Sequence, residues 1–273
     1  MKLASFDPLR TLGLPVAIHI KPDHFYRHIA ALRGVDWVLF PEYWQVNPLV
    51  FGLNARIFPS LSAYLLGHDK IEMTRTFLSI VPEHVPQTVI VANAPEHAAD
   101  VWDQMTLPFV AKIPRSSMGC GVFLIETPLD WRRYLGLSPV IYAQEYLPID
   151  RDVRIVVAGH QVLGGFWRIQ SNRGFYNNIS RGGQLDLSPV PEAALELVGC
   201  LCRMLKINYA GFDVAMVAGH PYLLEFNRLF GNFSLNLFAP KVPKAIMDFL
   251  SRESDENNPL TPIRPPTPLP RAA

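Results

Sequence analysis

Two short apolar runs separated by a glycine turn constrain the fold of this chain more than any other feature. Residues 211–217 and 221–227 have the composition of strands, and the turn between them centres on Gly219. Antiparallel pairing about that centre places Asp213 opposite Glu225, because each lies six positions from it. The pattern therefore predicts a β-hairpin that carries two carboxylates at directly opposed positions.

The opposed carboxylates require a positive partner. Asn227 falls on the same face as Glu225, since side chains two apart on a strand point the same way. Like charges directly opposite destabilise a sheet, and the other residues on that face are apolar. Mg²⁺ suits such an oxygen set and is commonly shared with nucleotide phosphates. The alternative is a one-residue register slip that separates the acids, or pairing of the acids with arginine.

Composition limits the kinds of partner. The chain has 273 residues, of which 49% are hydrophobic, so it can bury a large core as one large domain or two smaller ones. It carries 25 Lys+Arg against 24 Asp+Glu. A chain so nearly neutral is not expected to bind nucleic acid as its main partner, because phosphate-tracking surfaces show excess basic residues.

The sequence also predicts a cytoplasmic protein without a membrane anchor. Asp7 and Arg10 interrupt any secretory apolar region at the N-terminus, and no later apolar run reaches the length of a membrane span. The three cysteines provide no disulfide framework. We expect them to be reduced and buried.

The order of elements favours an α+β fold. Residues 1–65 alternate short strands with a helix and predict a small α/β domain, whereas mixed strands and hairpins follow. We expect a helix over 64–78, a lid subdomain over about 79–146, an amphipathic helix over 191–205, and last ordered strands at 210–217 and 222–227.

A proline-rich tail ends the chain. Six prolines fall in the last fifteen residues, after a polar stretch that begins at Glu253. Residues 253–273 are therefore predicted to be disordered or in polyproline II conformation. A ligand for an aromatic-groove domain is the alternative to a solvated terminus.

Two further segments have the character of anion or nucleotide sites. Lys112 ends a predicted strand and precedes a Ser/Gly-rich turn that can direct amides and hydroxyls at phosphate, although the segment taken alone favours a purely structural turn. It is neither a Walker A motif nor a dinucleotide fingerprint. The strand end at residues 144–147 could hydrogen-bond a purine edge. Lys70 alone would be a solvated lysine.

Taken in order, these motifs resemble the ATP-grasp superfamily, and most closely the RimK-like carboxylate-amine ligases. The resemblance covers roughly residues 66–237. The matching motifs are Asp69-Lys70, Val110-Ala-Lys112, the Ser/Gly loop to Gly121, Gln144-Glu-Tyr-Leu147, Asp152-Val-Arg154, Asn178-Ile-Ser-Arg-Gly-Gly183, Gly211-Phe-Asp213 and Leu224-Glu-Phe-Asn227. The resemblance implies an ATP-grasp domain over 66–252 behind an N-terminal pre-ATP-grasp domain.

The resemblance also implies roles for individual residues. Those expected to bind ATP are Lys70, Lys112, Ser116, Ser117, Gly119, Gly121, Gln144, Glu145, Tyr146, Leu147, Asp152 and Arg154. Those expected to bind the metal are Asp213, Glu225 and Asn227, with two Mg²⁺ ions and Mn²⁺ as an alternative. Those expected to handle phosphate and substrate carboxylate in catalysis are Arg168, Asn178 and Arg181.

The implied reaction joins a small carboxylic acid to an amine, either of which could be an amino acid or peptide. ATP phosphorylates the carboxylate, and the amine then attacks the acyl phosphate. A phosphotransferase and a non-catalytic ATP-binding regulator are the alternatives. The sequence leaves the oligomeric state open, with a homodimer as one candidate. Arg228–Ser234 departs from the small, proline-containing turn of related ligases, so the acceptor pocket is not carried over.

Overall fold

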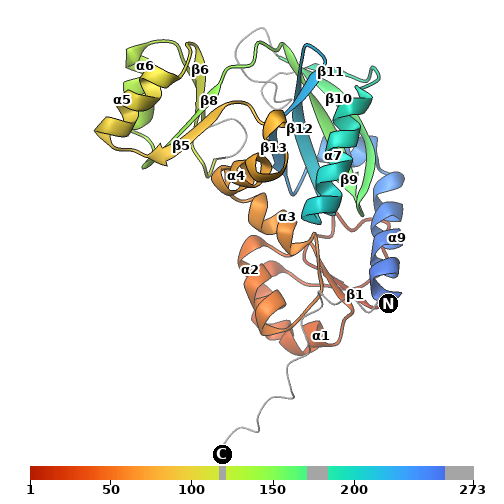
Figure 1. Cartoon of the computed structure of the whole chain (residues 1–273). Coiled ribbons are helices and arrows are strands. Elements are labelled where there is room, and N and C mark those ends of the chain that lie inside the picture. The colour runs from red at the N-terminus through yellow and green to blue at the C-terminus, as the bar shows by residue number, and fades with distance from the viewer. Residues whose placement is uncertain (117–120, 171–183, 256–273) are drawn as a thin grey trace, which may run out of the picture.

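Three sheets organise the molecule (Figure 1). The computed structural model describes residues 1–116, 121–170 and 184–255. A parallel sheet of order β2-β1-β3-β4 forms the N-terminal unit, an antiparallel sheet β5-β8-β6-β7 forms the lid, and an antiparallel sheet β11-β10-β9-β12-β13 forms the centre. The α+β fold class expected from the sequence is confirmed.

The N-terminal unit is a small α/β layer that shares a core with the central sheet. Its strands are β1 (Leu3–Ser5), β2 (Val16–His19), β3 (Trp37–Leu39) and β4 (Ile57–Phe58). Its helices are η1 (Pro22–His28), α1 (Ile29–Arg33), α2 (Tyr43–Asn47), η2 (Pro48–Gly52) and α3 (Leu61–Leu66). Phe40 and Phe58 pack edge-on against Tyr209 of the central sheet, with ring centroids 5.0 and 5.7 Å away. The two units are therefore bound by a common hydrophobic cluster.

The lid has its own core and presents one strand end to the rest of the molecule. Its elements are β5 (Thr88–Ala92), α5 (Pro95–Gln104), β6 (Phe109–Lys112), β7 (Val122–Ile125), α6 (Pro128–Leu135) and β8 (Val140–Glu145). Phe109, Trp131 and Tyr134 are buried together. The Tyr134 hydroxyl donates to the carbonyl of Lys112 at 3.0 Å. This bond fixes the end of β6, from which the Lys112 side chain projects.

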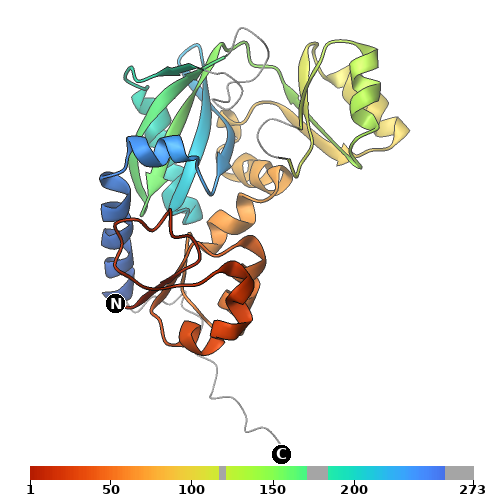
Figure 2. The ribbon, with the colours of Figure 1, turned by 180° about the vertical axis from the view of Figure 1, so that it is seen from behind.

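The central sheet carries the hairpin on which the sequence argument rests. Its elements are β9 (Arg151–Ala158), β10 (Gln161–Ile169), β11 (Gln184–Asp186), α7 (Glu192–Leu205), β12 (Tyr209–Val217) and β13 (His220–Asn227). The predicted amphipathic helix is confirmed as α7, whose Ala194, Leu197, Val198 and Leu201 are buried in the core of this domain. In Figures 1 and 2 the lid and the N-terminal unit adjoin different ends of this central part.

One helix was predicted with the wrong extent. The helix expected over 64–78 is two helices, α3 and α4 (Lys70–Ile80), because Gly67 ends the first and Asp69 begins the second. The Asp69 side chain accepts the amide of Ile71 at 2.8 Å, an N-cap that satisfies a free donor of the first turn. The break places Lys70 at the start of α4.

The last ordered elements are helices, not the strands at 210–217 and 222–227. Two helices follow the hairpin, α8 (Asn232–Leu237) and α9 (Lys241–Asp255). Val242, Ala245, Ile246 and Phe249 lie at helical spacing and bury one face of α9 against the N-terminal unit and the central sheet. The helix also includes residues 253–255, which were assigned to the tail, and the remaining tail lies outside the described residues.

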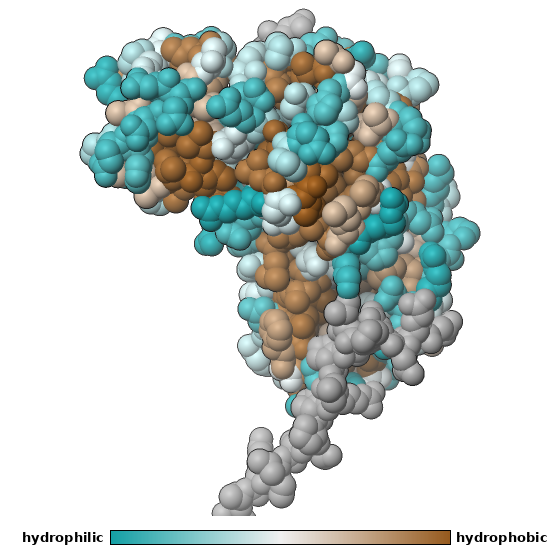
Figure 3. All heavy atoms as spheres, viewed as in Figure 1, coloured by the Kyte–Doolittle hydropathy of each residue, from teal (hydrophilic) through white to brown (hydrophobic). Residues whose placement is uncertain are grey.

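Within the described ranges, no helix combines the length and apolarity that a membrane crossing requires. On the face seen in Figure 3, hydrophobic residues gather between the lid and the central sheet and extend over α3. The outer rim of the lid and the edge formed by α9 are mainly hydrophilic. The junction of the three units is thus where apolar surface and the candidate site residues meet.

Candidate functional site

The hairpin has the predicted register. Asp213 pairs with Glu225 and Gly211 with Asn227, and an irregularity follows Asp213 on β12. Asp213 is buried at 5% exposure, whereas Glu225 and Asn227 are half-buried at the end of β13. Asn227 Nδ2 lies 3.4 Å from Glu225 Oε1. The register-slip alternative is excluded, and the three side chains do share one end of one hairpin.

Arginine pairing also occurs, and among the described residues it involves Asp213 and not Glu225. Arg154 Nε lies 2.8 Å from Asp213 Oδ1, and Arg168 Nη2 lies 3.0 Å from the same oxygen. These are ion pairs without hydrogen-bond geometry. Within the described part of the chain Oδ1 has no hydrogen-bond partner, whereas Arg154 Nη2 donates to Oδ2 at 3.2 Å. Burial raises the pKa of Asp213 to about 6, against the opposing influence of both arginines.

Asp152 and Arg168 form a second buried pair. Arg168 donates to both carboxylate oxygens of Asp152 at 2.7 Å, and the two residues are 5% and 4% exposed. Burial alone would lower the pKa of Arg168, but Asp213 and Asp152 raise it well above its ordinary value. This bidentate ion pair engages both carboxylate oxygens of Asp152 within the protein. Its assignment to ATP binding stays a prediction.

The two predicted lysines face the same region from different units. Lys70 Nζ lies 3.4 Å from Glu225 Oε2 and donates to the carbonyl of Ser116 at 2.6 Å. Lys112 Nζ donates to Gln144 Oε1 at 2.6 Å and is 8% exposed. Burial lowers the pKa of Lys112 to about 8, with Lys70 adding to the decrease and Glu225 opposing it.

Glu225 responds to both lysines. Burial would raise the pKa of Glu225, but the attraction of Lys70 and then Lys112 holds it below its ordinary value. A carboxylate kept ionised beside two ammonium groups, one of them buried, is an unusual concentration of charge for a protein interior. Perturbed groups of this kind cluster at functional sites.

The described residues of the loop between β6 and β7 contact α4 and bond to one another. Ser116 Oγ donates to the carbonyl of Ile113 at 2.7 Å, and the Ile113 amide donates to the carbonyl of Gly121. A Cβ on Gly121 would overlap the side chain of Ser116 and lie 2.9 Å from Ile113 Cβ, so only glycine fits this closure. Ser117 and Gly119 lie outside the described residues, as do Asn178 and Arg181.

The predicted purine edge is the end of β8. Gln144 is buried, with Nε2 donating to Thr88 Oγ1 at 2.8 Å. Glu145 accepts the amide of Gln87 at 2.8 Å through its side chain, while its own amide donates to the carbonyl of Gln87. Tyr146 and Leu147 follow directly after the strand. The roles of these residues toward adenine stay predictions.

Sequence reasoning missed several residues of this region. Met73 Sδ accepts the amide of Phe226 at 3.3 Å, and Thr74 Oγ1 lies 2.7 Å from the hydroxyl of Tyr142. These contacts connect α4 to β13 and to the lid, and no local sequence pattern predicts them. Arg228 also lines the pocket between α4, the loop after β6 and the end of β13. Its position directly after Asn227 in the sequence could have identified it as a candidate site residue.

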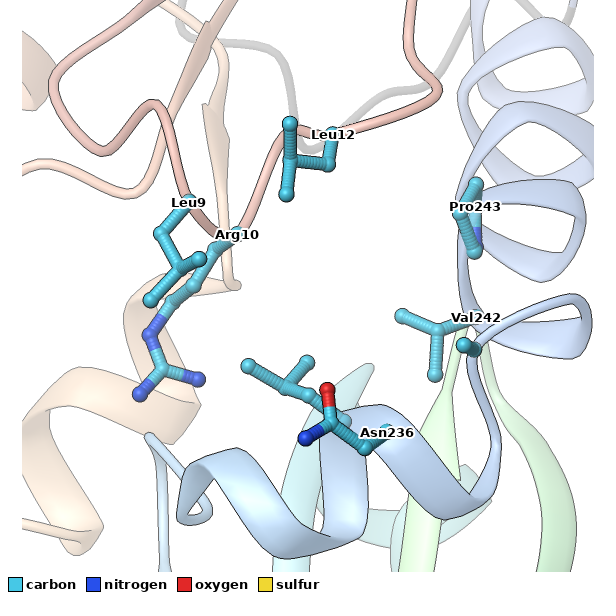
Figure 4. Close-up of a pocket in the computed structure, with 8 residues that line it drawn as sticks. Leu9, Arg10, Leu12, Asn236, Val242 and Pro243 are labelled. Carbon is cyan, nitrogen blue, oxygen red and sulfur yellow. The ribbon is translucent and has the colours of Figure 1, made fainter.

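A second hollow contains none of the predicted residues (Figure 4). It measures about 260 Å³ and lies between the N-terminal loop and helices α8 and α9. Leu9, Leu12 and Val242 make its wall apolar, while Arg10 is engaged by Asp7 and by the carbonyl of Phe230. The candidate site is therefore the junction of β13, α4 and the lid.

Comparison with known proteins identifies the family. A family model described as a RimK-like ATP-grasp domain matches residues 62–236, which is more than half of the chain. The chain belongs to the RimK-like ATP-grasp family. A ribosomal protein bS6–L-glutamate ligase of Escherichia fergusonii is 28% identical over 144 residues, covering 50% of this chain and 48% of that relative. A probable α-L-glutamate ligase of an Enterobacter species is 28% identical over 150 residues, covering 52% and 50%.

Solved structures share the fold. A D-alanine–D-alanine ligase from Bacillus anthracis superposes with a TM-score of 0.67 at 13% identity, covering 93% of this chain and 97% of that one. A RimK domain ATP-grasp protein from Sphaerobacter thermophilus superposes with a TM-score of 0.63 at 15% identity, covering 92% and 100%. By sequence, the chain matches only about half the length of its curated relatives.

The residues at the end of the hairpin suit a divalent cation in their chemistry. Glu225 and Asn227 offer a carboxylate and a carboxamide oxygen at the edge of a pocket of about 300 Å³, and Asn227 Nδ2 donates to Glu225 Oε1. Asp213 lies opposite, with Arg154 and Arg168 at 2.8 and 3.0 Å from its Oδ1. Carboxylate and carboxamide oxygens are the donors that Mg²⁺ prefers.

Proposed function

We propose that this member of the RimK-like ATP-grasp family is an ATP-dependent carboxylate-amine ligase. The supporting observation is the convergence of Lys70, Lys112, Glu225 and Asn227 from three different elements on one junction. The names of the relatives, which are glutamate ligases, agree with this class of reaction. The proposed products are an amide or peptide bond, ADP and phosphate.

The charges of the site suit phosphoryl transfer to a carboxylate. Bound Mg²⁺ would neutralise charge on the nucleotide phosphates, and Glu225, Asn227 and Asp213 are the residues proposed to hold it. Lys70 and Lys112 would bind the phosphate oxygens and stabilise the transferring group. Arg168 and Arg154 keep Asp213 in place, so that the oxygen donors are positioned before the ligands arrive.

The remaining predicted residues complete the proposal. Ser116, Ser117, Gly119 and Gly121 would close over the phosphates, and residues 144–147 would hold the adenine. Asn178 and Arg181 are proposed to contact the substrate carboxylate or its phosphate. The acyl phosphate intermediate, Mn²⁺ as a substitute metal and the cytoplasmic location stay predictions.

Product analysis tests this function. The protein is incubated with Mg-ATP and pooled carboxylic acids and amines, and phosphate and condensation products are measured. A ligase releases free phosphate only when acid and amine are both present. A phosphorylated product without free phosphate would identify a phosphotransferase instead, and bound but unreacted ATP would identify a regulator.

A further inference from the structure

Exposed aromatic side chains gather on one part of the N-terminal unit. Five aromatic side chains in the described ranges are more than a third exposed, and four of them lie within residues 26–51. Tyr26 of η1 and Phe51 of η2 are 71% and 70% exposed, and Trp44 of α2 is 45% exposed. These three residues form the aromatic surface of the unit. Exposed apolar clusters of this kind mark interaction sites, because large rings gain most from leaving water.

The rings of the aromatic surface are held in fixed positions. The ring centroids of Tyr26 and Trp44 are 6.4 Å apart, and the buried ring of Phe25 contacts both of them edge-on at 5.0 and 5.6 Å. Trp44 Nε1 donates to Glu42 Oε2 at 2.7 Å. Phe51 lies in the same helical run of α2 and η2, about 10 Å further along its axis. The aromatic surface is therefore an elongated strip, not a single pocket.

The C-terminal tail starts beside the same unit. Trp37 Nε1 donates to Ser254 Oγ at 3.0 Å, and Arg56 Nη1 donates to the carbonyl of Glu253 at 3.1 Å. These bonds fix the last turn of α9 on the N-terminal unit. Arg56 follows Phe51 by five residues, which is at most about 18 Å of backbone. The chain thus leaves α9 close to one end of the aromatic surface.

The tail is long enough to reach the whole surface. Helices η1 and α2 cover one face of the parallel sheet, and α9 covers the other (Figure 1). The 18 residues after Asp255 span about 56 Å in polyproline II conformation. A unit of about 66 residues has a radius of gyration of about 11 Å, so the path around half of it is roughly 45 Å. The tail of the same chain can therefore pass from α9 to the opposite face.

The tail has the periodicity of an amphipathic polyproline II helix. Every third residue from 259 to 268 is a proline, and that helix has three residues per turn, so these prolines share one edge. The second edge is also apolar and consists of Leu260, Ile263, Pro266 and Leu269. The third edge is mainly polar and consists of Thr261, Arg264, Thr267 and Pro270. Two apolar edges beside one polar edge suit a segment that lies on an apolar surface.

We propose that residues 259–269 bind the aromatic surface of the same chain in polyproline II conformation. Proline-rich segments bind aromatic-lined surfaces in this way, because the preformed helix has little conformational entropy left to lose. The Glu42 carboxylate beside the Trp44 indole suits the charge of Arg264. Attachment to the same chain gives an effective concentration of about 1 mM, so a contact with a Kd of about 0.1 mM is mostly occupied. The inference does not depend on the ligase function.

Backbone ¹⁵N relaxation of the full-length protein tests the proposal on the tail. We expect order parameters above about 0.6 at Ile263 and Leu269 in the unmodified protein, and below about 0.6 when Tyr26→Ala and Phe51→Ala are combined. Both replaced side chains are at least 70% exposed, so this variant should keep its fold. Leu137→Ala, which removes an exposed leucine of the lid, is the control and should change neither value. Values below about 0.6 in the unmodified protein would overturn the proposal.

Fluorine NMR of protein labelled with 5-fluorotryptophan tests the proposal on the aromatic surface. The Trp44 resonance is assigned by its loss in Trp44→Phe. It should move when Leu260→Ser, Ile263→Ser and Leu269→Ser are combined, because the tail then leaves the indole. A synthetic peptide of residues 256–273, added to this serine variant, should restore the original position with a Kd of about 0.1–1 mM.

The polar edge of the tail supplies the matched control. Thr261→Ala combined with Thr267→Ala should leave the Trp44 resonance in place. An identical Trp44 resonance in the unmodified protein and the serine variant would overturn the proposal. So would a resonance that moves with protein concentration. If only the unmodified protein showed that movement, the tail of a second copy would be the occupant, and if the serine variant showed it too, the folded part of a second copy would be.

Discussion

Replacing Lys112 with methionine tests whether this buried lysine serves function or stability. Lys112 is 8% exposed, and burial lowers its pKa from 10.5 to about 8. That difference corresponds to about 3 kcal/mol spent on keeping an ammonium group in the interior at neutral pH. Methionine has a similar length and carries no charge, so the variant removes this cost.

Two lost contacts offset the gain. The Lys112 ammonium donates to Gln144 Oε1 at 2.6 Å, and leaving that oxygen without a donor costs about 1–3 kcal/mol. The ammonium also lies 5.5 Å from the centre of the Tyr142 ring, a contact worth about 0.5–1 kcal/mol. We therefore expect the free energy of unfolding of Lys112→Met at pH 7 to lie between about 1 kcal/mol lower and about 1.5 kcal/mol higher than that of the unmodified protein.

The pH dependence gives a sharper test. The unfolded chain keeps the lysine proton to near pH 10.5, whereas the folded protein releases it near pH 8. The unfolded state therefore binds more protons in between, and stability rises with pH over this window. For a group with these two values the rise between pH 7 and pH 9 is about 1.3 kcal/mol. It should be present in the unmodified protein and absent in the variant.

Urea unfolding at pH 7 and pH 9, together with ATP binding by calorimetry, measures both effects. Lys112→Met should bind ATP at least about 10-fold more weakly while remaining as stable as the unmodified protein. The exposed Lys244→Met of α9 is the control and should retain the pH-dependent rise and ATP binding. A loss of 2 kcal/mol or more at pH 7, with ATP affinity unchanged, would refute a functional role for Lys112.

Three further changes test the site. Glu225→Ala should lower Mg²⁺-dependent turnover at least about 100-fold with an unchanged circular dichroism spectrum, and unchanged turnover would contradict the metal assignment. Asp152→Ala removes one of the two buried carboxylates that pair with Arg168, and it should lower the free energy of unfolding in urea by about 3 kcal/mol. A decrease below about 1 kcal/mol would show that the pair is dispensable. Gly211→Ala pushes a Cβ to 2.7 Å from the neighbouring guanidinium and should cost about 1–3 kcal/mol; Gly231→Ala, with open space around it, is the control and should be nearly neutral.

The hairpin could be predicted because its information is local. A two-strand pairing around Gly219 depends on a turn and on alternation, and both are visible in a single stretch of sequence. The pairing of Asp213 with Glu225 followed from their equal separation from Gly219, six positions on either side. The stripe of α7 was visible for the same reason, since its apolar residues recur at helical spacing.

The partners of Asp213 could not be predicted in the same way. Arg154 and Arg168 come from two other strands, and their approach depends on how β9 pairs with β10 on one side and with β12 on the other. Helix α9 was missed because its apolar stripe precedes a polar, proline-rich end that dominated the composition of the region. The contact of Arg228 with the ring of Tyr64 joins two residues that lie far apart in sequence. Contacts of this kind are set by tertiary packing.

The central claim is that this chain condenses an acid and an amine at the expense of ATP. Mass spectrometry of a reaction with Mg-ATP, pooled carboxylic acids and pooled amines, with free phosphate measured alongside, tests it most directly. We predict a condensation product formed in equal amount with ADP and phosphate, and only when acid and amine are both present. A phosphorylated product that accumulates without free phosphate would contradict the claim.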